Sequence, residues 1–251
     1  MSNAHHVIGS GARKVIVLHG WFGDGHAFAP IEPLLDPHHY TWVFMDCRGY
    51  GEMKDAHGAF TMDEIAEDTL ALAHSLGFSD FALVGHSMGG MAMQRVLTRA
   101  PDRVRSLLGI NPVPASGVPF DDTAWELFSG AAEKRENRYA IIDYTTGHRH
   151  PQAWIDGLVD YSLEHSNRAA FAAYLPAWAK FDFSDEVKGL THQVKVIVGE
   201  HDPALDADTA RRTFLAWYPN ATLEVMPGAG HYPMHETPEA LARSMQAFLE
   251  H

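Results

Sequence analysis

Short apolar runs alternate along this chain with longer segments of helical periodicity, and this alternation constrains the fold more than any other feature. The runs are rich in β-branched and aromatic residues, which is typical of buried strands in a parallel sheet. They are Val15–Leu18, Thr41–Met45, Phe81–Val84, Val104–Ile110, Val194–Val198 and Thr222–Met226. The amphipathic segments between and after them are Ala27–Leu35, Met62–Leu76, Met88–Arg99, Thr209–Tyr218 and Glu239–Leu249. Repeated strand–helix–strand units predict an α/β fold with a mostly parallel sheet and helices on both faces.

The alternation stops between Asn111 and about Asp185. This stretch opens with three prolines and continues as helical, aromatic-rich sequence without a strand signal of comparable strength. Ligands of open α/β sheets bind beside the carboxyl ends of the strands, where such an insertion would lie. We therefore expect a core built from residues 1–111 and 185–251, and a helical cap (lid) at 112–184 above an apolar pocket. The alternative is a helical packing layer without a role in binding.

The composition excludes several classes of partner. With 19 Lys+Arg and 32 Asp+Glu the formal charge is −13, which argues against binding to nucleic acid or to an anionic membrane. The apolar runs are far shorter than the roughly 20 residues that span a bilayer. The single cysteine, Cys47, cannot form an internal disulfide, and the first residues lack the apolar core of a secretory signal. We therefore expect a cytoplasmic protein.

The strand at 81–84 is followed by the sequence Gly-His-Ser-Met-Gly-Gly at 85–90 and then by a predicted helix. Gly-x-Ser-x-Gly between a strand and a helix is the pattern of a nucleophile elbow, which presents the serine hydroxyl above the sheet. We expect a positive φ at Ser87, and glycine at 85 and 89 because side chains there would collide across the turn. A turn that merely connects two elements is the alternative interpretation.

A serine hydroxyl is a poor nucleophile at neutral pH, so it needs an imidazole base that a carboxylate orients. His231 lies in a glycine-rich loop after the last predicted strand, which would bring it to the same sheet edge as Ser87. Asp202 follows another strand, and the order Ser87, Asp202, His231 is the order of the hydrolase triad. His235 is the alternative base. The alternative carboxylates are Glu200, Asp206 and Asp208.

Acyl transfer also requires two N–H donors for the negative charge that develops on the carbonyl oxygen. Met88 offers one at the start of its helix. Trp21 offers the second from the loop His-Gly-Trp-Phe-Gly at 19–23, and the N–H of Phe22 is the alternative. We expect Trp21, Phe22 and His86 to contact substrate, although core packing explains the Trp21 ring equally well. The clusters His38-His39 and His148-Arg149-His150 match no compact zinc pattern, so no metal or other cofactor is expected.

Together these segments resemble the α/β-hydrolase superfamily over nearly the whole chain. The matching pieces are His19-Gly20-Trp21, Asp46-Cys47-Arg48-Gly49-Tyr50-Gly51, the elbow at 85–90, Gly199-Glu200-His201-Asp202 and Gly230-His231. The resemblance implies an α/β-hydrolase fold and a triad of Ser87, His231 and Asp202. Within the superfamily, the chain is similar to the small carboxylesterases, including the pimeloyl-carrier-protein methyl ester esterases. The two antiparallel strands that open the family fold have little room before Val15.

The expected activity is that of a serine hydrolase that cleaves an ester or thioester of a small acyl substrate through an acyl-enzyme. Within the family, Ser87 argues against dehalogenase and epoxide hydrolase chemistry, which the resemblance ties to an aspartate nucleophile. His86 and the Trp21-Phe22 pair differ from the residues typical of the carbon–carbon bond hydrolases and, at 86, of the cofactor-free perhydrolases. A carbon–carbon bond hydrolase or lyase on the same triad, and a non-catalytic ligand receptor with a hydrolase-like scaffold, are the alternative functions.

Overall fold

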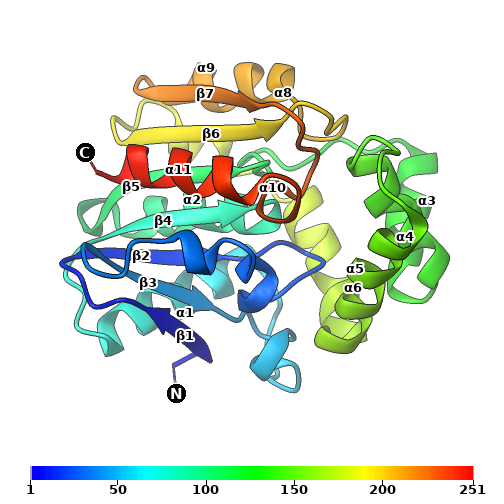
Figure 1. Ribbon diagram of the computed structural model, residues 1–251, viewed down its shortest axis with the longest axis horizontal. Helices are drawn as coiled ribbons and strands as arrows, with labels where there is room; N and C mark the ends of the chain where they lie inside the picture. The colour runs from blue at the N-terminus through cyan, green and yellow to red at the C-terminus, as the bar shows by residue number, and fades with distance from the viewer. Residues whose placement is uncertain (1, 251) are drawn as a thin grey trace.

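A seven-stranded sheet forms the centre of the structure, a computed structural model that describes residues 2–250 (Figure 1). The strand order is β1-β3-β2-β4-β5-β6-β7, and every neighbouring pair is parallel except β1 and β3. The strands are β1 (His5–Ile8), β2 (Arg13–Leu18), β3 (Tyr40–Met45), β4 (Phe81–His86), β5 (Val104–Ile110), β6 (Gln193–Gly199) and β7 (Ala221–Met226). All six predicted apolar runs lie in strands, and the prediction of an α/β-hydrolase fold is confirmed.

The strand β1 has no counterpart among the predicted runs. It pairs antiparallel with β3 at the edge of the sheet, where His5 lies opposite Met45. Its burial is intermediate to exposed along its length, so it lacks the apolar run that identifies the central strands. One antiparallel strand therefore precedes β2 in the described part of the chain, and the sheet is short at this edge, as expected.

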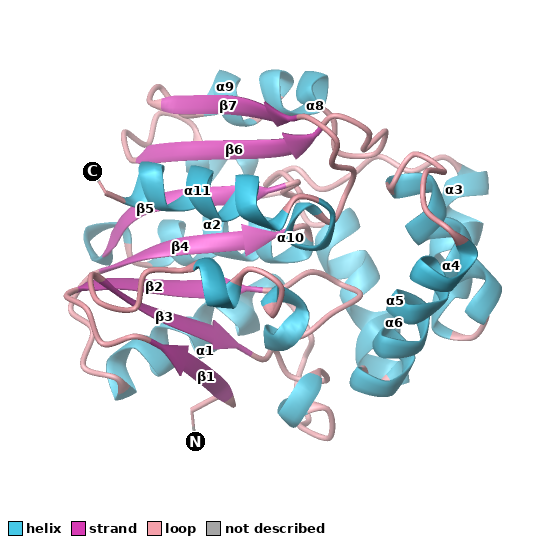
Figure 2. Ribbon diagram, viewed as in Figure 1, coloured by secondary structure: helices cyan, strands magenta, loops and turns pink. Residues whose placement is uncertain are grey.

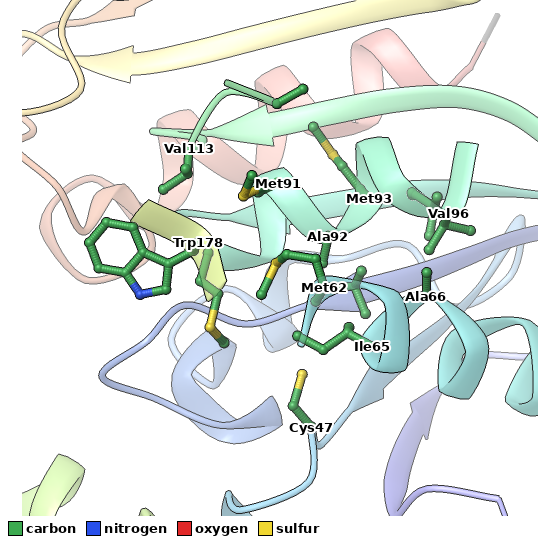
Figure 3. Packing of buried hydrophobic residues seen from close by; sticks show 14 of the residues in the cluster. Cys47, Met62, Ile65, Ala66, Met91, Ala92, Met93, Val96, Val113 and Trp178 are labelled. Atoms are coloured by element: carbon green, nitrogen blue, oxygen red, sulfur yellow. The ribbon is translucent and has the colours of Figure 1, made fainter. Parts of the chain in front are cut away.

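Helices cover both faces of the sheet (Figure 2). One face packs against α1 (Met62–Ser75), α2 (Met88–Arg99), α8 (Ala207–Arg212) and α9 (Phe214–Trp217). The other packs against α10 (Pro233–Glu236), α11 (Pro238–Leu249), the 3-10 turn η1 (Gly25–Phe28) and the residues Ile31 and Leu35, which flank the 3-10 turn η2 (Glu32–Leu34). Figure 3 shows part of the first core, which includes Met62 of α1, Met91 and Met93 of α2 and the buried Cys47. Burial raises the pKa of the Cys47 thiol well above its usual value.

Two helix predictions require correction. The segment Ala27–Leu35 forms the two 3-10 turns η1 and η2 instead of an α-helix. Pro30 and Pro33 explain this difference, because proline lacks the N–H that an α-helix needs and its ring clashes with the preceding turn. The segment Thr209–Tyr218 is divided into α8 and α9 at Thr213, whose ψ of −89° departs from helical geometry.

The segment at 112–184, called the cap below, is helical. It contains α3 (Asp122–Ser129), the 3-10 turn η5 (Gly130–Ala132), α4 (Arg135–Thr145), α5 (Gln152–His165), α6 (Arg168–Ala179) and the start of α7 (Ser184–Val187). Helices α3 to α6 lie together beyond the carboxyl ends of the parallel strands, on the right of Figure 1. Two further 3-10 turns, η3 (Gly51–Met53) and η4 (Pro101–Arg103), connect core elements. None of the helices found within residues 2–250 combines the length and apolar character that crossing a membrane requires.

Candidate active site

Ser87 occupies a strained turn between β4 and α2. Its φ of 52° and ψ of −115° lie in a region that residues other than glycine rarely adopt. The turn is held because the Ser87 N–H donates to the carbonyl of Ile110 at 3.1 Å and the Ser87 carbonyl accepts from Val113 N–H at 3.0 Å. A Cβ at Gly85 would collide with the backbone of Gly89 across the turn, as expected. The expectation requires correction at Gly89, where a Cβ would instead collide with the carbonyls of Leu18 and His19 at the end of the neighbouring strand β2. The turn therefore presents the Ser87 side chain beyond the carboxyl end of the sheet.

Asp202 and His231 come together at the same edge, from the loops after β6 and β7. His231 Nδ1 and Asp202 Oδ2 are 2.6 Å apart, and both side chains are buried, with exposed fractions of 10% and 0%. The second carboxylate oxygen, Oδ1, accepts from the N–H groups of Ala204 at 2.9 Å and Leu205 at 3.3 Å. These contacts satisfy the buried carboxylate and fix the imidazole with Nδ1 toward Asp202. Nε2 is the ring nitrogen left to exchange a proton.

Asn111 is a member of this network that the sequence analysis did not identify. Its Nδ2 donates to Asp202 Oδ2 at 2.7 Å, and its Oδ1 accepts from Gly199 N–H at 3.3 Å. The residue is fully buried and has a positive φ of 42°. The sequence does hold one signal for this role: Asn111 is a polar residue that directly follows the apolar strand β5 and precedes Pro112, at the sheet edge where the triad is expected.

The alternative residues have other partners. Glu200 accepts from Gly228 N–H at 3.0 Å near the surface. Asp206 caps α8 by accepting from Thr209 N–H, and Asp208 pairs with Arg211. His235 lies near the site as a lining residue of a cavity described below. The structure therefore places Asp202 and no other candidate carboxylate against His231.

His19 fixes the orientation of the peptide between Gly20 and Trp21, in the loop at 19–23. The His19 Nε2 accepts from Cys47 N–H at 3.1 Å, so the ring proton is on Nδ1, which donates to the Gly20 carbonyl at 2.8 Å. In a trans peptide the carbonyl and the following N–H point in opposite directions. The Trp21 N–H is thus directed away from His19. Neither Trp21 N–H nor Met88 N–H donates a hydrogen bond within residues 2–250, so both are free to bind an anion.

The ring of Trp21 is held by the cap. Its Nε1 donates to the Phe171 carbonyl at 2.8 Å, and the two rings stack with centroids 4.0 Å apart. The buried guanidinium of Arg138 lies 3.8 Å from the centroid of the Phe171 ring. Because Trp21 stacks on one face of that ring, Arg138 lies over the opposite face. Burial lowers the pKa of Arg138 to about 10, so the group remains charged at neutral pH. Two cap residues therefore fix the position of Trp21.

Two cavities meet at Ser87. Both are lined by Trp21, Phe22, Ser87, His231 and Tyr232. The larger, of about 140 Å³, also contacts His26, Tyr161 and His235, and we call it the histidine arm. The smaller, of about 50 Å³, also contacts Phe120, Phe128 and Trp178, and we call it the aromatic arm. No hydrogen bond joins Ser87 to His231 in the described residues. Hydrogen bonds between catalytic groups often form only when substrate binds.

His86 contacts the histidine arm and also supports the loop that carries His231. Its Nε2 donates to the backbone carbonyl of His231 at 2.8 Å. Burial is the main reason that the pKa of His86 lies well below its usual value, and the neighbouring His231 contributes in the same direction. The ring is therefore neutral at pH 7. His86 therefore lines the histidine arm, where we predict that it contacts substrate, while its Nε2 is engaged in a hydrogen bond to the protein.

Comparison with known proteins places this geometry in context. A model of the alpha/beta hydrolase family matches residues 15–244. The chain is 30% identical to a non-heme chloroperoxidase of Streptomyces lividans, over 85% of this chain and 83% of that protein. It is 28% identical to a 2-hydroxymuconate semialdehyde hydrolase of Pseudomonas putida, over 80% and 73%. An esterase structure from Exiguobacterium antarcticum, 19% identical, superposes with a TM-score of 0.88 over 98% of this chain and 95% of that one, a likeness in fold.

Proposed function

This chain belongs to the alpha/beta hydrolase family, and on that premise we propose that it is a serine hydrolase for small, uncharged carboxylic esters or thioesters. Ser87 is the nucleophile, His231 the general base and acid, and Asp202 the carboxylate that orients the imidazole. The observation that carries the proposal is the 2.6 Å contact between buried His231 and Asp202 beside the strained turn of Ser87. All three residues stand at one edge of the sheet.

The reaction proceeds in two halves. In the first, Ser87 Oγ attacks the acyl carbon while its proton passes to His231 Nε2, and the Trp21 and Met88 N–H groups bind the oxyanion. The intermediate collapses when His231 returns this proton to the leaving alcohol or thiol, which leaves the acyl group on Ser87. In the second half, His231 deprotonates a water molecule that attacks the acyl-enzyme, and the carboxylic acid and free Ser87 are regenerated. The chemistry needs no cofactor.

The lining of the two arms supports an uncharged substrate. Within the described residues no lysine or arginine lines either arm, and the buried carboxylate of Asp24 binds Tyr161, a lining residue of the histidine arm, at 2.6 Å. A substrate that carries a carboxylate, as a muconate does, would meet no lysine or arginine in this cavity and would lie near the Asp24 carboxylate, which costs free energy. This favours esters over the carbon–carbon bond hydrolase alternative.

A test is to incubate the protein with p-nitrophenyl acetate and butyrate, and separately with a fluorophosphonate. We expect a burst of p-nitrophenol followed by turnover, and a covalent adduct that peptide mass spectrometry locates on Ser87. A vinylogous 1,5-diketone should be turned over much more slowly. Faster diketone cleavage would favour the carbon–carbon hydrolase. Absence of both the burst and the adduct would contradict the proposal and favour the non-catalytic receptor.

The aromatic arm should set the length of the acyl chain. The p-nitrophenyl group fits better in the larger histidine arm, which leaves the smaller arm for the acyl chain. Val118, Ala204 and Leu205 form a wall between this arm and a surface groove of about 320 Å³. We expect Leu205→Ala to open the wall and to raise the kcat/KM ratio of hexanoate to butyrate esters about 10-fold, since each buried methylene contributes ~0.8 kcal/mol.

The Leu205 N–H that binds Asp202 is retained in this variant, so the triad contacts are preserved. Leu190→Ala is the matched control, because Leu190 packs against the same core but lines neither arm. Its chain-length profile should equal that of the unmodified protein. An unchanged hexanoate to butyrate ratio in Leu205→Ala would mean that the acyl chain lies elsewhere.

A further inference from the structure

Glu236 is a buried carboxylate that the triad mechanism does not use. It ends α10, and its side chain is 1% exposed. Oε2 accepts from Gly230 N–H at 2.8 Å, and Oε1 accepts from Tyr232 N–H at 2.9 Å. These two residues flank His231 directly. The carboxylate therefore holds the backbone on both sides of the general base.

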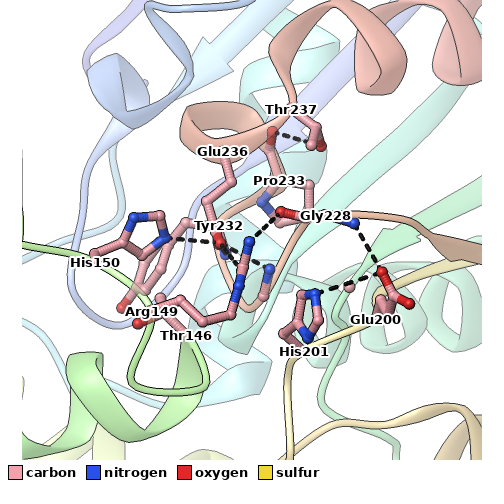
Figure 4. Close-up of polar contacts among 12 residues, drawn as sticks. Thr146, Arg149, His150, Glu200, His201, Gly228, Tyr232, Pro233, Glu236 and Thr237 are labelled. Carbon is pink, nitrogen blue, oxygen red and sulfur yellow. Dashed lines mark hydrogen bonds and ion pairs between the residues drawn. The ribbon is translucent and has the colours of Figure 1, made fainter.

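The same carboxylate contacts the cap (Figure 4). His150 Nε2 lies 2.9 Å and Arg149 Nη1 lies 3.1 Å from Glu236 Oε2. His150 is fixed in turn by stacking on Trp154, with ring centroids 3.8 Å apart. Burial of a carboxylate is unfavourable unless donors surround it, and here two amides and two cap side chains do so. Glu236 is thus a shared anchor for the catalytic loop and the cap.

Two further contacts join the same two parts. Arg149 Nη2 donates to the carbonyl of Gly228, at the start of the catalytic loop, at 2.8 Å. The His231 N–H donates to the carbonyl of Thr145, at the end of α4 in the cap, at 3.1 Å. Three consecutive amides, those of residues 230, 231 and 232, are therefore held by Glu236 and the cap. The loop begins at Gly228, whose φ is 76°, and has no regular secondary structure of its own until α10 begins. Its conformation depends on these contacts.

We propose that Glu236 is a positioning residue for His231, and that two cap residues couple the cap to the catalytic loop. His150 acts through Glu236, whereas Arg149 acts both through Glu236 and through its own bond to the Gly228 carbonyl. The inference rests on the proposed function, because it assumes that His231 is the general base. Glu236 does not touch the substrate cavities, since it lines neither arm. Its loss should therefore affect the step in which His231 moves a proton and leave substrate binding largely unchanged.

The test compares Glu236→Gln with Glu200→Gln. A glutamine at 236 keeps one acceptor oxygen but replaces the other by an NH₂ group, so one amide beside His231 loses its partner. We expect kcat for p-nitrophenyl butyrate to fall about 10- to 100-fold with KM changed less than about 2-fold, because small misplacements of catalytic groups are costly. Glu200 also accepts an amide of this loop, that of Gly228, but is more exposed, and Glu200→Gln should keep kcat within about 2-fold.

Hydrogen exchange provides a measurement that is independent of activity. Glu236→Gln, and also Arg149→Gln combined with His150→Gln, should increase amide exchange in residues 228–232, whereas Glu200→Gln should not do so at 230–232. Unchanged kcat in folded Glu236→Gln, or equal falls in kcat for Glu236→Gln and Glu200→Gln, would overturn the positioning role. Unchanged exchange in the double variant would overturn the coupling to the cap. Failure of the proposed function would be seen separately, as an unmodified protein without ester hydrolysis.

Discussion

Replacing Ser87 by alanine is expected to lower kcat for p-nitrophenyl esters by about 10⁵- to 10⁶-fold, with KM nearly unchanged. Without the hydroxyl no acyl-enzyme can form, and His231 and Asp202 have no nucleophile to activate. Residues of such a triad act as a unit, so loss of one removes almost the whole contribution of the three. The free N–H groups of Trp21 and Met88 remain and can still polarise a bound carbonyl. Some acceleration over the reaction in water should therefore persist.

The measurement is steady-state hydrolysis together with fluorophosphonate labelling of the same preparation. Ser116→Ala is the control, because Ser116 lies beside the surface groove behind the aromatic arm and lines neither arm. It should retain labelling and near-normal kcat. The Ser87→Ala protein should unfold at a similar temperature to the unmodified chain, since alanine changes one atom at an already strained position. Activity above a hundredth of normal in Ser87→Ala would place the nucleophile elsewhere.

The strands and the elbow could be predicted because their signals are local. Phe81–Val84 is a continuous apolar run, and the glycine at 85 follows from the crowding of a turn within a few residues. The glycine at 89 belongs to the same motif, but its physical cause is the backbone of Leu18 and His19, which only the fold brings close. The segment Ala27–Leu35 shows the limit of this reasoning. Its apolar spacing is helical, but Pro30 and Pro33 prevent an α-helix, and their effect outweighs the periodicity. The strand β1 has no strong local signal, so only its pairing with β3 reveals it.

The residues of the candidate site also differ in whether the sequence alone could predict them. Ser87, Asp202 and His231 could be proposed because each follows a strand of a parallel sheet, and the carboxyl ends of such strands share one edge. Asn111 and Glu236 were missed because their roles depend on contacts made only in the folded chain. A sequence offers no reason to connect Glu236 with Arg149, which lies 87 residues earlier, until the cap is placed above the loop of His231. The stack of Arg138 on Phe171 is equally invisible without the fold.

Asp202→Asn is expected to lower kcat about 10⁴-fold through the wrong imidazole tautomer. In the native protein Oδ1 accepts two backbone N–H groups, so an asparagine will keep its carbonyl oxygen there and direct its NH₂ group toward His231. That group is a donor, so His231 Nδ1 must become the acceptor and the ring proton moves to Nε2. Nε2 then cannot accept the Ser87 proton, and the imidazolium formed in the transition state also loses its counter-charge. KM should change less than about 3-fold, because Asp202 lines neither arm.

Asn111 strengthens this expectation. Its Nδ2 donates to the same Oδ2, so the new NH₂ group would face a second donor as well as His231. Rotating the Asn111 amide would relieve that conflict only by breaking its bond with Gly199 N–H. Asp206→Asn is the matched control, because Asp206 stands in the same loop and caps α8, a position where asparagine performs as well as aspartate. It should hydrolyse p-nitrophenyl butyrate at the normal rate. A kcat within 10-fold of normal in folded Asp202→Asn would show that His231 does not depend on Asp202 for its tautomer.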